Sequence, residues 1–271
     1  MSTNLEVGIV GLPNVGKSTL FNAITKAGAE AANYPFCTIE PNVGVVDVPD
    51  HRLNVLSDMV KARRIVPAAM RFVDIAGLVK GASKGEGLGN KFLAHIREVD
   101  AVAQVVRCFE DGNITHVEGS IDPLRDIEII NTELCLADME SVEKRMERLT
   151  KLLKTGDKKA VLEKACMEKV LEGLGDAIPA RRLGLTDDEK EFLKELHLLT
   201  MKPVLYITNV AESEVADPSG NVHVQAVTKY AAEEGAEVII VSAKMESEIA
   251  ELDDESAKEF LEMAGLTETG L

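Results

Sequence analysis

Eight residues near the amino terminus carry the clearest chemical pattern in the chain. Residues 11–18 read G-L-P-N-V-G-K-S, follow the apolar run at residues 7–10 and lead into a helix-like stretch at residues 19–24. Glycines at this spacing let the backbone fold around an anion with its N–H groups pointing inward, and a following helix adds the positive end of its dipole. The pattern predicts a phosphate-binding loop for a nucleoside triphosphate. The alternative is an ordinary glycine-rich turn, which the complete motif disfavours.

Two side chains at the end of this motif have defined roles in phosphate chemistry. Lys17 is expected to reach the β- and γ-phosphates and to act in catalysis, and the Ser18 hydroxyl is expected to ligate Mg²⁺. Asn14 is a candidate for a contact to the transition state, through a monovalent cation such as K⁺. The nucleotide-binding candidates of the loop, besides Lys17 and Ser18, are Asn14, Val15, Gly16 and Thr19.

A second element ends another expected strand. A D-I-A-G motif begins at Asp74, which is placed to hold Mg²⁺ through a water, and ends at Gly77, whose N–H is expected to contact the γ-phosphate during catalysis. The glycine-rich stretch at residues 80–89 is expected to order around that phosphate and to relax after hydrolysis. Thr38, between the first helix and the second strand, is a candidate to complete the Mg²⁺ shell. The alternative for Thr38 is an ordinary surface threonine.

The pattern of apolar residues predicts an α/β fold. Short apolar runs alternate with helix-like stretches, which suits a mostly parallel sheet covered by helices on both faces. Residues 127–200 differ, because they are rich in Leu, Glu and Lys and lack strand signals; they predict an inserted helical hairpin. Within it, Thr186 and Glu189 fit a capping box. The expected strands are residues 5–10, 43–48, 70–75, 101–108, 204–208 and 238–241.

Composition indicates a folded protein of the cytoplasm. Hydrophobic residues make up 45% of the 271 residues, and no apolar run approaches the roughly 20 residues of a membrane span. The amino terminus lacks the pattern of a signal peptide. The four cysteines are widely spaced, which argues against a disulfide framework or a zinc site. The net charge of −16 argues against broad, non-specific nucleic-acid binding.

Taken together, these motifs resemble the Ras-like P-loop GTPases of the translation-factor-related class, and specifically the YchF or Obg-like ATPase family. Residues 33–42 and 74–90 look like the long signatures of that family, and the resemblance covers essentially the whole chain. It implies a Ras-like NTPase domain at residues 1–126 and 201–271 and a coiled-coil-like helical domain at residues 127–200. It also implies association with ribosomes or translation factors. Family members normally continue into a TGS domain, and the 271 residues here are expected to end before it.

The residues after the fifth expected strand address the choice of base. Ras-like GTPases read guanine with N-K-x-D, whereas this chain has N-V-A-E beginning at Asn209. Val210 lacks the long stem of lysine, and Glu212 is one methylene longer than the aspartate that accepts from guanine. The family's N-x-x-E variant implies ATP over GTP, with Asn209 bonding N7 and the 6-amino group and Val210 packing on the base. The alternative is that Asn209 caps a turn. Ser242, Ala243 and Lys244, after the last expected strand, match the final base-contacting loop of the class.

The catalytic residues are inferred from a missing glutamine and from the resemblance of one histidine to a residue of the family. Ras-like enzymes place a glutamine after D-x-x-G to orient the attacking water, and this chain has Leu78 there. His116 resembles the proposed catalytic histidine of the family, and histidine suits water activation; the alternative is a bystander in a loop. The resulting hypothesis is a cytoplasmic switch in which Mg²⁺ and ATP order the loops and hydrolysis to ADP releases them. Two alternatives stay open: a GTPase with relaxed base choice, and a nucleotide-gated binding module with negligible turnover.

Overall fold

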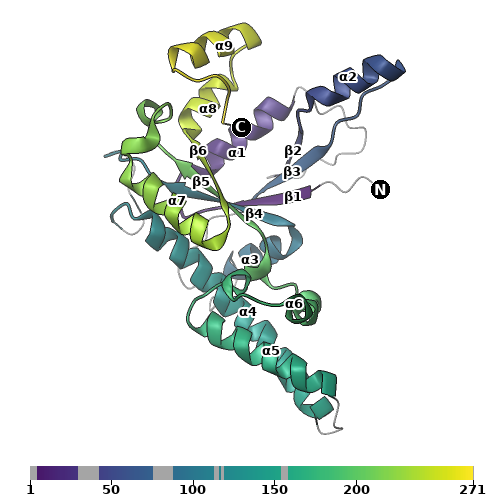
Figure 1. Ribbon diagram of the computed structural model, residues 1–271. Helices are drawn as coiled ribbons and strands as arrows, with labels where there is room; N and C mark the ends of the chain where they lie inside the picture. The colour runs from purple at the N-terminus through teal and green to yellow at the C-terminus, as the bar shows by residue number, and fades with distance from the viewer. Residues whose placement is uncertain are drawn as a thin grey trace.

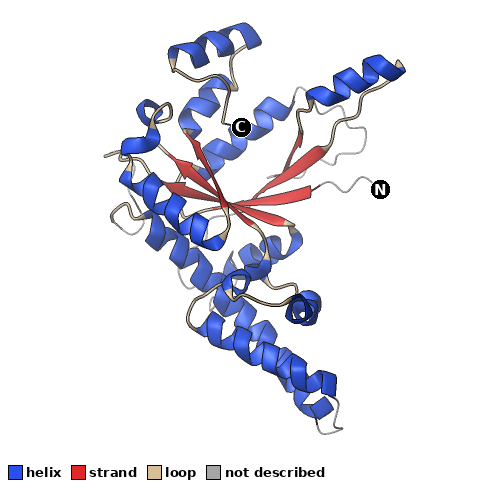
Figure 2. Cartoon of the chain, in the orientation of Figure 1, coloured by secondary structure: helices blue, strands red, loops and turns tan. Residues whose placement is uncertain are grey.

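The protein consists of a sheet flanked by helices and a helical arm that extends from one side of it (Figures 1 and 2). A computed structural model describes residues 5–29, 43–75, 88–112, 116, 119–153 and 158–270. Thr38, Gly77 and Leu78 lie outside the described residues.

The sheet confirms the predicted α/β fold. Its six described strands have the order β2-β3-β1-β4-β5-β6, and β2 runs antiparallel to β3 while the other pairs are parallel. Each predicted strand is present, with ends that differ by at most one residue. The strands are β1 (Leu5–Val10), β2 (Val43–Asp47), β3 (Ala69–Asp74), β4 (Ala101–Arg107), β5 (Val204–Asn209) and β6 (Glu237–Val241).

Helices cover both faces of this sheet. Figure 1 shows α1 (Lys17–Ala29) and α8 (Ala243–Ile249) on one face, and α4 (Pro123–Leu153) and α7 (Val222–Glu234) on the other. None of the helices in the described parts of the chain is long and apolar enough to cross a lipid bilayer. The remaining elements around the sheet are α2 (His51–Val60), α3 (Leu88–Glu98), α9 (Asp254–Met263) and two 3-10 helices, η4 (Glu212–Glu214) and η5 (Pro218–Gly220).

The sequence motifs lie at the carboxyl ends of the parallel strands, on one side of the sheet. Gly11 follows β1, Asp74 ends β3, Asn209 ends β5 and Ser242 follows β6. In open α/β sheets, ligands bind outside the carboxyl ends of the strands. The topology therefore brings residues from both ends of the chain to the place where a ligand site is expected.

The arm is helical, as residues 127–200 predict, and has a core of its own. Helix α5 (Lys158–Gly175) packs along α4, and the chain returns to β5 through η1 (Ala180–Arg182), α6 (Asp187–Leu193), η2 (Lys194–Leu196) and η3 (Leu199–Met201). Helix α4 begins at Pro123 and continues past residue 127, so the expected domain boundary falls inside a helix. The fully buried or nearly buried apolar side chains of this second core include Val142, Leu149, Met167, Val170 and Leu174.

The predicted capping box at the start of α6 is confirmed. The Thr186 N–H donates to Glu189 Oε2 at 2.8 Å, and the Glu189 N–H donates to Thr186 Oγ1 at 3.3 Å. Lys169 of α5 also lies 3.0 Å from Glu189 Oε2. Glu189 thus contributes both to the capping of α6 and to its position beside α5.

A buried carboxylate joins the arm to the strand that follows it. Asp138 of α4 is completely buried and accepts three hydrogen bonds: from the Leu199 N–H at 2.9 Å, the Thr200 N–H at 2.8 Å and Thr200 Oγ1 at 2.7 Å. Thr200 Oγ1 in turn accepts from the Ala180 N–H at 3.1 Å. Burial raises the pKa of Asp138, and the three donors oppose that shift. The carboxylate ties three segments of the arm together immediately before β5.

A second polar cluster links the arm to β5 and α7. Arg181 of η1 forms an ion pair with Glu234 at the end of α7, and Tyr206 Oη of β5 donates to Glu234 Oε2 at 2.9 Å. Tyr230 lies edge-on to Tyr206, with ring centroids 6.0 Å apart. The arm is therefore held to the same strand whose last residue, Asn209, lies at the candidate site.

We expect replacement of Asp138 by alanine to destabilise the protein strongly. It leaves two buried N–H groups and a hydroxyl without their acceptor, and each such loss costs on the order of 1–3 kcal/mol. The free energy of unfolding from urea titration should fall by about 3 kcal/mol or more. Glu140→Ala, on the same helix but exposed, is the control and should change it by less than about 1 kcal/mol. Equal stabilities of the two variants would contradict this role.

Candidate functional site

The motif at residues 11–18 forms a tight loop between β1 and α1. Asn14 and Gly16 both have left-handed backbone conformations, with φ of 65° and 94°. The Gly16 carbonyl accepts the Leu20 N–H at 3.0 Å, which starts the helix. A Cβ at Gly11 would lie 2.8 Å from the Val105 carbonyl oxygen of β4, so the loop packs directly on the sheet. This is the strand, loop and helix arrangement predicted from the motif.

Three polar side chains meet at the mouth of the loop. Lys17 forms an ion pair with Asp74, and Ser18 Oγ lies 3.5 Å from Asp74 Oδ2. The register of the sheet explains the meeting, because Ile9 pairs with Asp74 across β1 and β3. Thr19, the next residue of α1, is exposed on the same turn. The structure thus brings together an ammonium group, a hydroxyl and a carboxylate beside a row of loop amides.

The Asn209 side chain connects this loop with the segment after β6. Its Nδ2 donates to the Val15 carbonyl at 2.9 Å, and its Oδ1 accepts from the Ala243 N–H at 2.9 Å. The residue is 4% exposed. Asn209 therefore does more than cap a turn. A primary amide can form a second bond on each side, and the two bonds above are those that the described residues show, so the predicted contact to a base stays a prediction.

Val210 and Ser242, which were predicted to contact the base, are both buried. The Val210 side chain is 2% exposed and packs in the core with Val224 and Val227 of α7. In this conformation the neighbouring helix covers the apolar side chain at the strand end, and its predicted packing on the base stays a prediction. Ser242 is also buried, and its Oγ accepts from the Met245 N–H at 3.4 Å as the cap of α8.

Glu212 lies at the surface beside this segment and is paired. Its Oε2 is 3.0 Å from the Nζ of Lys244, the second residue of α8. The ion pair joins the segment after β5 to the segment after β6. The contact between Asn209 and Ala243 joins the same two segments. No sequence pattern predicts this ion pair, since the two residues are far apart in the chain and each one alone resembles a solvated charge.

His116 lies in a buried pair with an acid. Its Nε2 is 2.8 Å from Asp126 Oδ2 of α4, and the two side chains are 4% and 3% exposed. Burial raises the pKa of Asp126, and the hydrogen bond with His116 opposes the shift. A general base must lie within hydrogen-bond reach of the proton it removes. In this conformation the ring is held by Asp126, and the catalytic role of His116 stays a prediction.

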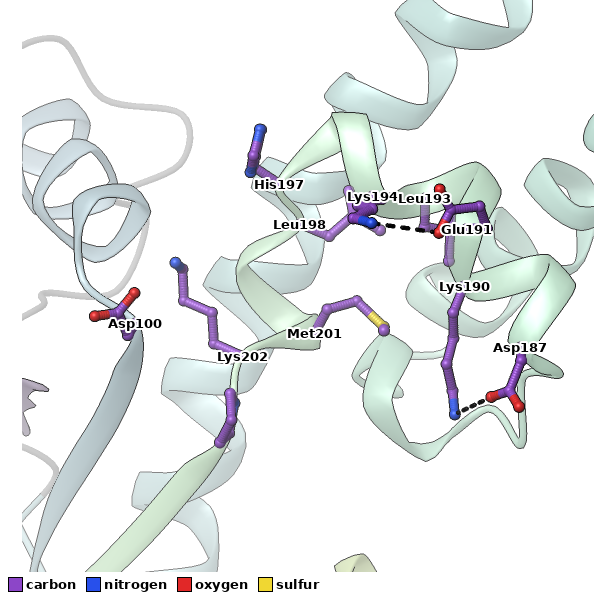
Figure 3. Close-up of a pocket in the computed structure, with 11 residues that line it drawn as sticks. Asp100, Asp187, Lys190, Glu191, Leu193, Lys194, His197, Leu198, Met201 and Lys202 are labelled. Atoms are coloured by element: carbon purple, nitrogen blue, oxygen red, sulfur yellow. Dashed lines mark hydrogen bonds and ion pairs between the residues drawn. The ribbon is translucent and has the colours of Figure 1, made fainter. Parts of the chain in front are cut away.

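A groove with a volume of about 420 Å³ lies at the other end of the strands, away from the phosphate loop (Figure 3). It opens between the amino ends of β4 and β5, at Asp100 and Pro203, and the helix α6. Its lysines are engaged within the protein: Lys190 pairs with an aspartate of α6 at 3.3 Å, and Lys202 donates to backbone carbonyls at the end of α3. The groove is thus separate from the phosphate loop, and its charges have partners.

We expect Gly16→Ala to abolish tight nucleotide binding. The added methyl group would collide with Asn209 Nδ2 and would hold an alanine at a φ of 94°. Titration with a fluorescent ATP analogue should show affinity at least about tenfold weaker, since the loop can no longer close on Asn209. The control is Gly220→Ala, where a Cβ meets nothing within 4 Å. Wild-type affinity in Gly16→Ala, with an unchanged melting temperature, would contradict the prediction.

Comparison with known proteins agrees with this geometry. The family model described as "50S ribosome-binding GTPase" matches residues 6–162. The ribosome-binding ATPase YchF of Bacillus subtilis (strain 168) is 61% identical over 267 residues, which cover 98% of this chain and 73% of that protein. The protein of the same name from Escherichia coli O157:H7 is 56% identical, with 98% and 72% covered. The solved YchF GTPase of Schizosaccharomyces pombe superimposes with a TM-score of 0.81 at 42% identity, covering 97% of this chain and 72% of that one.

Proposed function

Because the chain belongs to the YchF family, we propose that it is a magnesium-dependent ATPase that acts as a molecular switch. The observation that carries the proposal is the meeting of Lys17, Ser18 and Asp74 at the mouth of the phosphate loop. An ammonium group, a hydroxyl and a carboxylate beside loop amides are the groups that a metal-bound triphosphate requires. The names of the relatives support this activity, since the bacterial ones are called ribosome-binding ATPases.

The residues at the loop fit Mg²⁺. This ion prefers oxygen ligands, keeps several waters and takes only one or two protein side chains beside the phosphates. Ser18 and Asp74 supply a hydroxyl and a carboxylate 3.5 Å apart, and no group of three or more His, Cys, Asp or Glu that could hold a metal occurs in the described ranges. Ser18 would hold the ion directly and Asp74 through a water, with Thr38 as the further ligand. When bound, Mg²⁺ neutralises charge on the β- and γ-phosphates.

The chain's own groups bind and orient the phosphates. The amides of Asn14, Val15 and Gly16, together with the start of α1, hold the triphosphate, and Lys17 adds positive charge at its β- and γ-groups. The Gly77 N–H stabilises the charge that develops on the γ-phosphate, and Asn14 would add a contact there, with a K⁺ ion supplying further positive charge if one is bound. Water then attacks in line, with stabilisation that is mainly electrostatic. His116 acts as the base on the attacking water, and its ring, paired through Nε2 with Asp126 in this conformation, has to reach that water.

The same site favours adenine over guanine. The carboxylate of Glu212 is displaced by one methylene relative to the guanine-reading aspartate, and Asn209 remains to contact the base from its place between the loop and Ala243. The relatives differ in name, since the Schizosaccharomyces pombe protein is called a GTPase. The names of the bacterial relatives also support the ribosome as a partner, and hence a place in the cytoplasm.

Steady-state turnover tests the nucleotide choice. We expect hydrolysis of ATP at least about tenfold more efficient than that of GTP, because a polar mismatch in a dry pocket costs on the order of 1–3 kcal/mol. Removal of Mg²⁺ with EDTA should abolish both activities. Phosphate release over a range of ATP and GTP concentrations gives kcat/KM for each. A preference for GTP would overturn the base assignment, and a rate equal to that of buffer would leave the nucleotide-gated binding module.

The role of His116 needs its own variant. We expect His116→Ala to lower kcat for ATP at least about tenfold, as loss of a general base does, with ATP affinity unchanged. His51→Ala, which removes an exposed histidine of α2, is the control. Single-turnover phosphate release, together with ATP titration, separates chemistry from binding. Equal rates in the wild type and His116→Ala would exclude His116 as the base.

A further inference from the structure

One ion pair lies at the edge of the site where the base is expected. Lys244 Nζ is 3.0 Å from Glu212 Oε2, and the two residues come from the segments that follow β6 and β5. Lys244 directly follows Ala243, whose N–H donates to Asn209 Oδ1 at 2.9 Å. Glu212 lies three residues after Asn209. The ion pair therefore lies next to the hydrogen bond between Ala243 and Asn209, the asparagine proposed to bind the base.

The ammonium group is held mainly by this one carboxylate. Lys244 also approaches Glu248, one turn further along α8, but at 3.9 Å. The hydrogen bond and charge of Glu212 raise the pKa of Lys244, so the group stays protonated. One oxygen of Glu212 thus already accepts a charge-assisted hydrogen bond.

The two bases respond in opposite ways to such a pair. Guanine presents two donors on its Watson–Crick edge, N1–H and the 2-amino group, and a free carboxylate would accept from both. Adenine presents an acceptor at N1 and lacks the 2-amino group. A carboxylate that is engaged by an ammonium group has less to offer guanine, and the ammonium group itself repels guanine's donors while it can donate to adenine N1.

We propose that Lys244 determines base specificity, by engaging Glu212 and so disfavouring guanine relative to adenine. The inference rests on the proposed function, because it requires that a nucleotide base binds beside Asn209. A purely structural role for the pair is the competing explanation. That role would be small, since Lys244 is 69% exposed in its side chain and exposed ion pairs contribute little to stability.

The test is the ratio of the Kd for GTP to the Kd for ATP, measured with fluorescent analogues of both nucleotides in the presence of Mg²⁺. Lys244→Met keeps the length of the side chain and removes its charge. We expect this variant to lower the ratio about fivefold, mainly through tighter GTP binding, as the gain of one hydrogen-bond acceptor for guanine predicts. Lys244→Arg keeps a cation beside Glu212 and should retain the wild-type ratio.

Two further variants separate the pair from general charge effects. Lys258→Met removes an exposed lysine of α9 and should leave the ratio unchanged. Adding Glu212→Gln to Lys244→Met should remove the gain for GTP, because the freed carboxylate is then gone. A ratio within twofold of wild type in Lys244→Met would overturn the proposal. A wild type that prefers GTP would also overturn it, whereas a wild type that binds neither nucleotide would show that the proposed function itself is wrong.

Discussion

The candidate site depends on one side-chain amide, that of Asn209. It holds the Val15 carbonyl of the phosphate loop and the Ala243 N–H of the segment after β6. The loop has a left-handed glycine beside this amide, and a larger residue there would collide with it. Asn209 is the last residue of β5, so the sheet sets its position. The conformation of the loop therefore depends on the parallel sheet, which positions Asn209, as well as on the residues of the loop itself.

The helical arm is attached to the same strand. Asp138 gathers the end of the arm just before β5, and the Arg181, Glu234 and Tyr206 cluster holds the arm to the middle of β5 and the end of α7. These contacts are buried and polar, so they require defined partners where apolar packing would tolerate several. The arm has its own apolar core along α4 and α5. The helical arm thus meets the sheet at the strand that carries the amide contact.

Much of this architecture was predictable from local patterns. Strand ends, the loop motif and the capping box at Thr186 follow from short-range rules that act on residues close in sequence. The placement of Val210 was not, because its burial depends on α7 lying over the end of β5. The pairing of His116 with Asp126 and of Glu212 with Lys244 likewise depends on elements that meet only in the fold. Titratable groups form ion pairs and hydrogen bonds with residues that are close in space. The local sequence does not specify which residues those are.

The sequence by itself determined that the chain has a phosphate loop, an aspartate at the end of a strand and an α/β fold with a helical insertion, since each follows from contiguous residues or from apolar periodicity. The tertiary structure decided which of the candidate side chains are presented to a ligand and which are buried or paired. Lys17 and Asp74 meet because β1 and β3 are in register at Ile9, whereas His116 is held in the interior by α4. The reason is physical: hydrogen bonds and burial are settled by the packing of distant elements, which local spacing does not specify.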